Sequence, residues 1–146
     1  MHYYESMQAL IGHTPLVRLS HVGVPEGVKL FAKLELWNPS GSVKDRTGLY
    51  MVNAALEEGS LKPGGTIIEA TAGNTGLGIA FAALNRGLRV IFVVPNKFSQ
   101  EKQILLRALG AELINTPREE GMLGAEKKAE ELLKTIPGAV SLRQFR

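Results

Sequence analysis

One stretch decides the fold of this chain: Thr66-Ile67-Ile68-Glu69-Ala70-Thr71-Ala72-Gly73-Asn74-Thr75-Gly76. Its first five residues form a short, mostly apolar and β-branched run, which is typical of a buried strand. Apolar residues then recur at helical spacing at Leu77, Ala80, Phe81 and Leu84. The stretch therefore predicts a strand that passes through a glycine turn into a helix, which we expect to end at Gly87.

The same alternation continues towards the C-terminus. Further strands are predicted at 90–94, 111–115 and 139–142, and the helical patterns between them span about 10–15 residues. Strands that alternate with helices of this length are typical of a parallel sheet covered by helices on both faces. The predicted fold class is therefore α/β, with three α/β/α layers around a mostly parallel sheet.

Two of these helices carry specific predictions about their caps and faces. Ser99 is expected to cap the first helix. Its inner face is expected to carry Ile104, Leu105, Ala108 and Leu109. The next helix is expected to begin at Thr116, with Pro117 at its first position and Glu119 completing a capping box.

A second informative stretch lies upstream: Asn38-Pro39-Ser40-Gly41-Ser42-Val43-Lys44-Asp45-Arg46. It follows an alternating strand pattern at 29–36, and Ser42 is a candidate N-cap with Asp45 three residues further on. Lys44 is thus predicted to lie in the first turn of a helix. On spacing alone, it is either a solvated surface lysine or an amine activated by burial or by a neighbouring cation.

The turn at 71–76 lies where a strand passes into a helix, which is the edge of an open α/β sheet at which ligands usually bind. Its glycines allow backbone N–H groups to approach a ligand, and Thr71, Asn74 and Thr75 add neutral hydrogen-bonding side chains. Such a turn suits a carboxylate or a phosphate, although a capped turn without a ligand has the same composition. The glycine spacing G-x-x-G-x-G differs from the dinucleotide fingerprint, and the chain contains no Walker P-loop motif.

Composition narrows the function classes. The 146 residues are 45% hydrophobic and 21% charged and include no cysteine, which is typical of a globular protein and excludes disulfides and thiolate metal sites. A net charge of +3 does not favour nucleic-acid binding, and no apolar run reaches membrane-spanning length. His2, His13 and His21 lack metal-ligand spacing, so no metal site is predicted. The N-terminus does not resemble a secretory signal, so we expect a cytoplasmic protein.

Four ordered motifs together resemble a known family. They are G-H-T-P-L-V-R-L (12–19), N-P-S-G-S-V-K-D-R (38–46), E-A-T-A-G-N-T-G (69–76) and P-N-K-F-S-Q-E-K (95–102). Over essentially the whole chain they resemble the fold-type II pyridoxal-phosphate enzymes, within the cysteine synthase and cystathionine β-synthase branch. Ala72 and the stretch at 91–103 are more similar to the bacterial O-acetylserine-dependent cystathionine β-synthases, which use homocysteine and an activated serine.

The resemblance implies roles for particular residues. Lys44 would form the imine with the aldehyde of pyridoxal 5′-phosphate and would later act as the base for the substrate α-proton. Asn74 would hydrogen-bond the ring hydroxyl of the cofactor. The carboxylate of the amino-acid substrate would be bound by Thr71, Ala72, Gly73, Asn74, Thr75 and Gln144. The implied reaction is β-replacement on O-acetylserine or serine by a thiol, which gives cysteine or cystathionine.

The resemblance also implies a domain organisation. Residues 1–36 would pair with a larger cofactor domain, residues 37–146 would form the smaller α/β domain, and the rest of the larger domain would lie outside these 146 residues. The complete enzyme is expected to be a homodimer.

Two alternatives to this enzyme stay open at this point. One is a serine or threonine dehydratase, although those enzymes usually have phenylalanine where this chain has Val43, and another is a fragment without catalytic activity. Sulfide and homocysteine both stay open as acceptors. Cysteine synthases usually carry serine at the position of Ala72, which argues against sulfide.

Overall fold

The computed structural model describes residue 1, residues 3–71 and residues 73–142. The strands are β1 (Leu16–Arg18), β2 (Phe31–Lys33), β3 (Thr66–Ala70), β4 (Arg89–Pro95), β5 (Glu112–Thr116) and β6 (Ala139–Val140). The α-helices are α1 (Lys44–Glu57), α2 (Asn74–Ala83), α3 (Gln100–Ala108) and α4 (Gly121–Thr135). Short 3-10 helices are η1 (Gln8–Leu10), η2 (Glu35–Trp37) and η3 (Arg118–Glu120).

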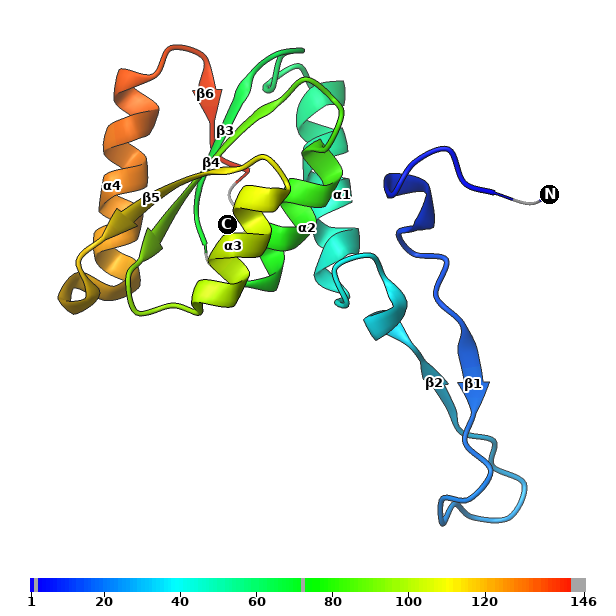
Figure 1. The fold of residues 1–146 in the computed structure, drawn as a ribbon. Coiled ribbons are helices and arrows are strands. Elements are labelled where there is room, and N and C mark those ends of the chain that lie inside the picture. The colour runs from blue at the N-terminus through cyan, green and yellow to red at the C-terminus, as the bar shows by residue number, and fades with distance from the viewer. Residues whose placement is uncertain (2, 72, 143–146) are drawn as a thin grey trace.

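The body of the molecule is a four-stranded parallel sheet in the order β5-β4-β3-β6 (Figure 1). Helices α1, α2 and α3 cover one face through a core that includes Ile67, Phe92 and Leu106. Helix α4 covers the other face and packs against Ile68 and Ile91. The predicted three-layer α/β/α fold class is confirmed.

The apolar runs of β3 and β4 follow from their central position in the sheet. Successive side chains of a strand point to opposite faces, so Ile67 belongs to the core under α1, α2 and α3, and Ile68 to the core under α4. A strand covered on both faces does not alternate with polar residues. Because full burial of one such side chain stabilises the fold by about 1.5–3 kcal/mol, the end of β3 that leads into Thr71 is firmly placed.

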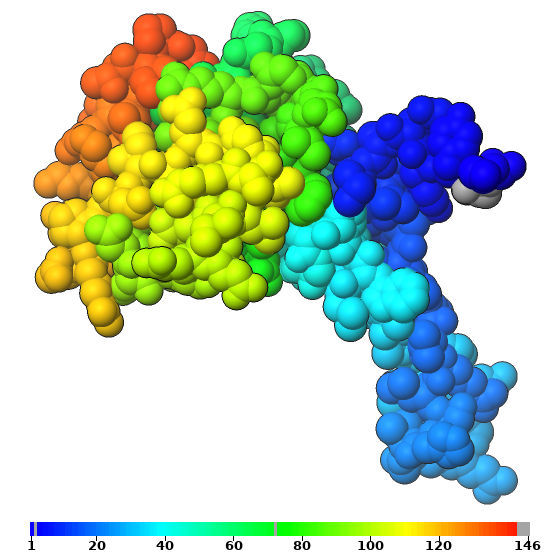
Figure 2. Space-filling view, in the orientation of Figure 1, coloured from blue at the N-terminus to red at the C-terminus, as the bar shows by residue number. Residues whose placement is uncertain are grey.

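The hairpin of β1 and β2 is antiparallel and projects away from the sheet and its helices (Figures 1 and 2). Leu16, Val17 and Phe31 are all exposed on it. The strand predicted over 29–36 is shorter in the structure, because the chain turns into η2 directly after Leu34.

Helix α2 begins at Asn74 and ends at Ala83, before the predicted stop at Gly87. Gln8 Nε2, from a distant part of the chain, donates hydrogen bonds at this end to the carbonyl oxygens of Phe81, at 2.8 Å, and Leu84, at 2.7 Å. The Phe81 carbonyl also accepts the N–H of Leu84, so Gln8 adds to the backbone cap. Although α2 is apolar, the described part of the chain contains no helix long and apolar enough to cross a membrane.

The inner face of α3 differs from the prediction. The residues expected to point inwards are exposed or only partly buried: Ile104, Leu105, Ala108 and Leu109. Gln103 and Leu106 are buried instead. The amide of Gln103 accepts a hydrogen bond from Asn115 Nδ2 at 2.9 Å and donates one to the carbonyl of Phe98 at 3.2 Å. A polar side chain with both bonds satisfied can be buried at little cost, which periodicity of apolar residues does not reveal.

The start of α4 also differs from the prediction. Thr116 is the last residue of β5 rather than a helix cap, and its buried Oγ1 has no hydrogen-bond partner among the described residues. Pro117 has an extended backbone, and the η3 turn separates it from α4. The capping box predicted with Glu119 is therefore wrong, because the chain makes a 3-10 turn before the helix begins at Gly121.

Candidate functional site

Lys44 is the first residue of α1 and is exposed. Ser42 was predicted to cap this helix, but Val43 occupies the cap position, and Ser42 Oγ accepts the nearby N–H of Lys44, at 3.1 Å. Asp45 is fully buried. Its carboxylate accepts hydrogen bonds from the backbone N–H of Ser40, at 2.7 Å, and from the Ser40 hydroxyl. Asp45 thus closes the turn onto Ser40, because a buried carboxylate requires donors on its oxygens.

Backbone contact between α1 and α2 places Lys44 near the turn at 71–76. A Cβ atom at Gly78 would lie 2.3 Å from the carbonyl oxygen of Lys44, and one at Gly48 would lie 2.2 Å from the carbonyl carbon of Gly78. Only glycine allows two helices to approach this closely. Because Gly78 lies about one helical turn after Asn74, the first turns of α1 and α2 are close together.

The turn between β3 and α2 carries the residues predicted to bind substrate. Thr71 is buried, and a Cβ atom at Gly76 would lie 3.1 Å from its Cγ2. Gly73 occupies the N-cap position of α2, while Asn74 and Thr75 are its first two residues. The first N–H groups of a helix have no partner within the helix and carry partial positive charge. This arrangement suits a carboxylate.

Two of the predicted site residues, Ala72 and Gln144, lie outside the described residues. The others are brought together at the starts of α1 and α2: Lys44, Thr71, Gly73, Asn74 and Thr75. This placement is compatible with an aldehyde cofactor, because a residue with an exposed primary amine has its backbone close to a helix whose N-terminus carries neutral donors.

Lys102 also reaches this turn, although the sequence patterns assign it no role. It lies in the first turn of α3, which Ser99 caps as predicted, and its Nζ donates to Asn74 Oδ1 at 3.1 Å. An ammonium can only donate, so this contact directs the Nδ2 donor of Asn74 away from Lys102. The position of Lys102 soon after β4 could have identified it from the sequence. The carboxyl ends of β3 and β4 lie at the same edge of a parallel sheet, so residues that follow the two strands lie near one another.

Glu69 is a second residue that pattern analysis did not single out. It is buried in β3, and its Oε1 accepts hydrogen bonds from the Ser141 hydroxyl, at 2.8 Å, and from the Leu142 N–H, at 2.5 Å. The chain that follows β6 is therefore held against the end of β3. Glu69 could have been identified from the sequence as the single carboxylate within an apolar strand, because a buried carboxylate requires partners.

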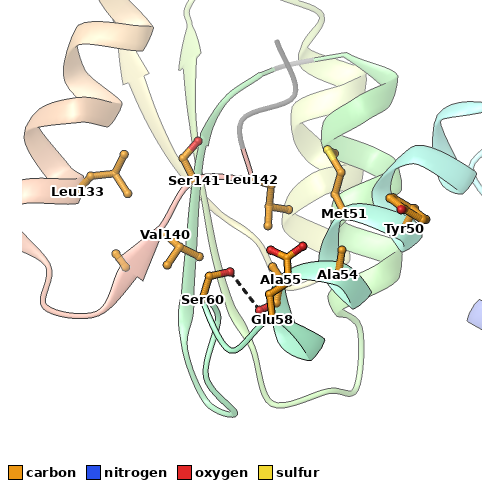
Figure 3. A pocket seen from close by; sticks show the side chains of 11 residues that line it. Tyr50, Met51, Ala54, Ala55, Glu58, Ser60, Leu133, Val140, Ser141 and Leu142 are labelled. Carbon is orange, nitrogen blue, oxygen red and sulfur yellow. Dashed lines mark hydrogen bonds between the residues drawn. The ribbon is translucent and has the colours of Figure 1, made fainter. Parts of the chain in front are cut away.

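A cleft of about 700 Å³ lies between α1 and the chain around β6 (Figure 3). Met51 and Ala54 line it from α1, while Val140 and Leu142 line it from the other side. Glu58 contributes a carboxylate. Among the described residues, its lining includes neither the lysine of the first turn of α1 nor the first turn of α2.

An ion pair lies next to the lysine turn. Arg46 Nε donates to Glu35 Oε2 at 2.8 Å, and Arg46 Nη2 donates to Glu35 Oε1 at 3.0 Å. The hydrogen bonds from Arg46, and then those from Thr14 and Asn38, lower the pKa of Glu35 from 4.5 to about 2, although burial opposes this shift. Glu35 in turn raises the pKa of Arg46. The pair therefore stays ionised at neutral pH.

The fold and this arrangement define the class of protein. The chain belongs to the family of pyridoxal-phosphate dependent enzymes, whose family model it matches over residues 7–146. The resemblance inferred from the four motifs is thus confirmed, and pyridoxal phosphate is the cofactor of the family. The roles of individual residues stay predictions.

Particular relatives narrow the class. The O-acetylserine dependent cystathionine beta-synthase of Bacillus subtilis (strain 168) is 54% identical over 137 residues, which cover 94% of this chain and 45% of that protein. A cysteine synthase of Helicobacter pylori is 47% identical over 142 residues, which cover 96% of this chain and 46% of that protein. A crystal structure of cystathionine beta-synthase from Bacillus anthracis matches with a TM-score of 0.85 and 57% identity, covering 97% of this chain and 53% of that one. The chain spans about half the length of these relatives.

Proposed function

We propose that this chain is the lysine-bearing part of an enzyme that replaces the β-substituent of an O-activated L-serine with a thiol. The observation that carries the proposal is that Lys44 is exposed while its backbone packs against Gly78, near the start of α2. The chain is also 54% identical to an O-acetylserine dependent cystathionine beta-synthase. When bound, the cofactor supplies a ring that stabilises negative charge at the substrate α-carbon.

Lys44 has two roles in this proposal. Its Nζ would hold the cofactor through the aldehyde group, and as a free amine it would accept the substrate α-proton. The backbone of Lys44 is held by the Ser42 hydroxyl and by Gly78, while its side chain is exposed. A fixed backbone with an exposed side chain allows Nζ to act at two neighbouring positions.

The turn at 71–76 orients the substrate. Backbone N–H groups in the first turn of α2, with the side chains of Thr71 and Thr75, bind the substrate carboxylate, and Gln144 completes this set. Asn74 donates from Nδ2 to the ring hydroxyl of the cofactor, which is consistent with the contact between its Oδ1 and Lys102. Together these contacts direct the α-proton towards Lys44.

Substitution of Lys44 tests the proposal directly. The complete enzyme is incubated with pyridoxal phosphate and reduced with borohydride, and the modified lysine is identified by peptide mass spectrometry. We expect modification mainly at Lys44, and Lys44→Ala should lose that adduct and most of the visible absorbance band. Lys62→Ala, which removes another exposed lysine, is the matched control and should keep both signals. An adduct at the wild-type level in Lys44→Ala would show that the assignment is wrong.

The acceptor thiol is a finer part of the proposal. We infer that Ala72 favours a larger thiol such as homocysteine over sulfide, because serine at this position would add a hydroxyl to the substrate turn. One neutral hydrogen bond contributes about 0.5–1.5 kcal/mol, so Ala72→Ser should shift the sulfide-to-homocysteine rate ratio of the complete protein by roughly threefold to tenfold. Product formation with each thiol measures the ratio. An unchanged ratio would contradict this inference.

The domain organisation is also a proposal. The exposed apolar hairpin of β1 and β2 supports the idea that residues 1–36 pair with a larger domain of the complete enzyme, because a two-stranded hairpin is only marginally stable by itself. We further propose that the complete enzyme is a cytoplasmic homodimer. Sedimentation of the complete protein as a monomer would rule out the dimer.

A further inference from the structure

The side chain of Arg46 connects three segments of the chain. It belongs to the first turn of α1, two residues after Lys44. Its Nη2 donates to the carbonyl of Gly12, at 2.9 Å, and to Thr14 Oγ1, at 3.1 Å, in the segment before β1. Its fork to Glu35 reaches η2, which follows β2. One guanidinium thus joins both ends of the hairpin to the helix that carries the lysine.

The groups around this guanidinium are satisfied by one another. Thr14 Oγ1 donates to Glu35 Oε1 at 2.8 Å, and Asn38 Nδ2 donates to Glu35 Oε2 at 2.9 Å. The N–H of Gly12 donates to Asn38 Oδ1 at 2.9 Å. Thr14 and Asn38 are both buried. A network in which each member has its partners is rigid and specifies one arrangement.

The backbone at Gly12 is shaped around the arginine. Gly12 has φ +86°, and a Cβ atom there would lie 2.8 Å from Arg46 Nη1. A side chain at this position would therefore displace the guanidinium. We call the network of Gly12, Thr14, Glu35, Asn38 and Arg46 the joint. Beside it, the N–H of Leu34 donates to the carbonyl of Pro15 at 2.9 Å, which holds the two strands of the hairpin together at their base.

We propose that Arg46 and Glu35 are positioning residues for Lys44. They fix the base of the hairpin to the first turn of α1, so the part of the enzyme that binds the hairpin also sets where the lysine lies. This inference rests on the proposed function of Lys44 and adds to it the residues that place it.

The fork geometry explains why arginine is needed at this position. Arg46 donates to both oxygens of Glu35 and to two further acceptors, whereas lysine is a point charge on a flexible stem. Arg46→Lys therefore keeps the charge and loses the geometry. Glu35→Gln keeps the shape and loses the charge, which makes it a second variant for the case in which Arg46→Lys does not fold.

The chain contains a matched control pair. Arg89 Nε donates to Glu112 Oε1 at 2.7 Å, and Arg89 Nη2 donates to Glu112 Oε2 at 2.8 Å. This fork has the same geometry but links the neighbouring strands β4 and β5. Arg89→Lys therefore reports what the loss of an arginine fork does to stability alone.

The experiment measures the selectivity of Lys44 modification. The complete enzyme and its variants are incubated with limiting pyridoxal phosphate and reduced with borohydride, and the adduct at Lys44 is compared with that at Lys62 in the same sample. We expect this ratio to fall about tenfold in Arg46→Lys and Glu35→Gln, because a displaced reacting group loses much of its effective concentration. The ratio should stay within about twofold in Arg89→Lys.

Amide hydrogen exchange provides an independent reading of the joint. In Arg46→Lys and Glu35→Gln, exchange should increase at β1, β2 and the first turn of α1 together, and in Arg89→Lys it should stay unchanged there. Variants that are folded by circular dichroism and keep the wild-type labelling ratio would overturn the proposal. If the unaltered complete enzyme shows no preference for Lys44, the proposed function fails instead. Unchanged hydrogen exchange in Arg46→Lys and Glu35→Gln would refute the proposed link between the hairpin and α1.

Discussion

Strands β3 and β1 both contain apolar residues but differ completely in burial. Both contain β-branched apolar residues, yet β3 is buried along its whole length and β1 is exposed along its whole length. In the described part of the chain, β3 pairs with β4 and β6 and lies between two helix layers, whereas β1 pairs only with β2. Strand propensity therefore sets the local form, while the neighbouring elements decide burial.

The largest expected difference between the body and the hairpin is the loss of stability when a glycine is replaced by alanine. In the body, a Cβ atom at Gly78 would overlap the backbone of Lys44, whereas in the hairpin no atom lies within 4 Å of one at Gly23. Because backbone cannot move aside as a flexible side chain can, Gly78→Ala should cost more than about 4 kcal/mol. Gly23→Ala should change stability by less than about 0.5 kcal/mol. Urea denaturation of both variants tests this pair, and equal midpoints would contradict the close helix crossing.

A second comparison concerns apolar side chains. Ile68 is completely buried in β3, so Ile68→Ala should cost about 3 kcal/mol in unfolding free energy. Val17 is exposed on β1, so Val17→Ser should change stability by less than about 0.5 kcal/mol and should reduce self-association of the 146-residue chain. Denaturation and sedimentation velocity measure the two effects. A large loss of stability in Val17→Ser would mean that the hairpin is buried by the chain itself.

The smallest expected effect concerns pH and the joint between the two regions. The folded-state pKa of Glu35 is about 2, below its ordinary value of 4.5, so this carboxylate stabilises the fold fully above pH 4.5. That contribution should decline as the pH falls from 4.5 through about 2. Glu35→Gln cannot titrate, so its stability should show less dependence on pH in this window. Thermal unfolding between pH 2 and pH 5 checks this, and parallel curves would refute the assignment.

The alternation of strands and helices was predictable because each element carries its own periodicity and its own turn residues. Lys44 and the turn at 71–76 were found in the same way, from short local motifs. The burial of Gln103 and the position of Thr116 were not predictable, because they depend on Asn115 and on the η3 turn. Local patterns report what a segment prefers, not which distant groups satisfy it.

By itself, the sequence determined the α/β class, the order of its elements and the family, because buried strands, glycine turns and four ordered motifs are local features. Only the tertiary structure decided that Gly48 and Gly78 bring the first turns of α1 and α2 together, and that Arg46 joins the hairpin to the lysine helix. These contacts join residues up to 34 positions apart in the chain. Such pairs arise from packing and hydrogen-bond geometry in three dimensions, which no local pattern encodes.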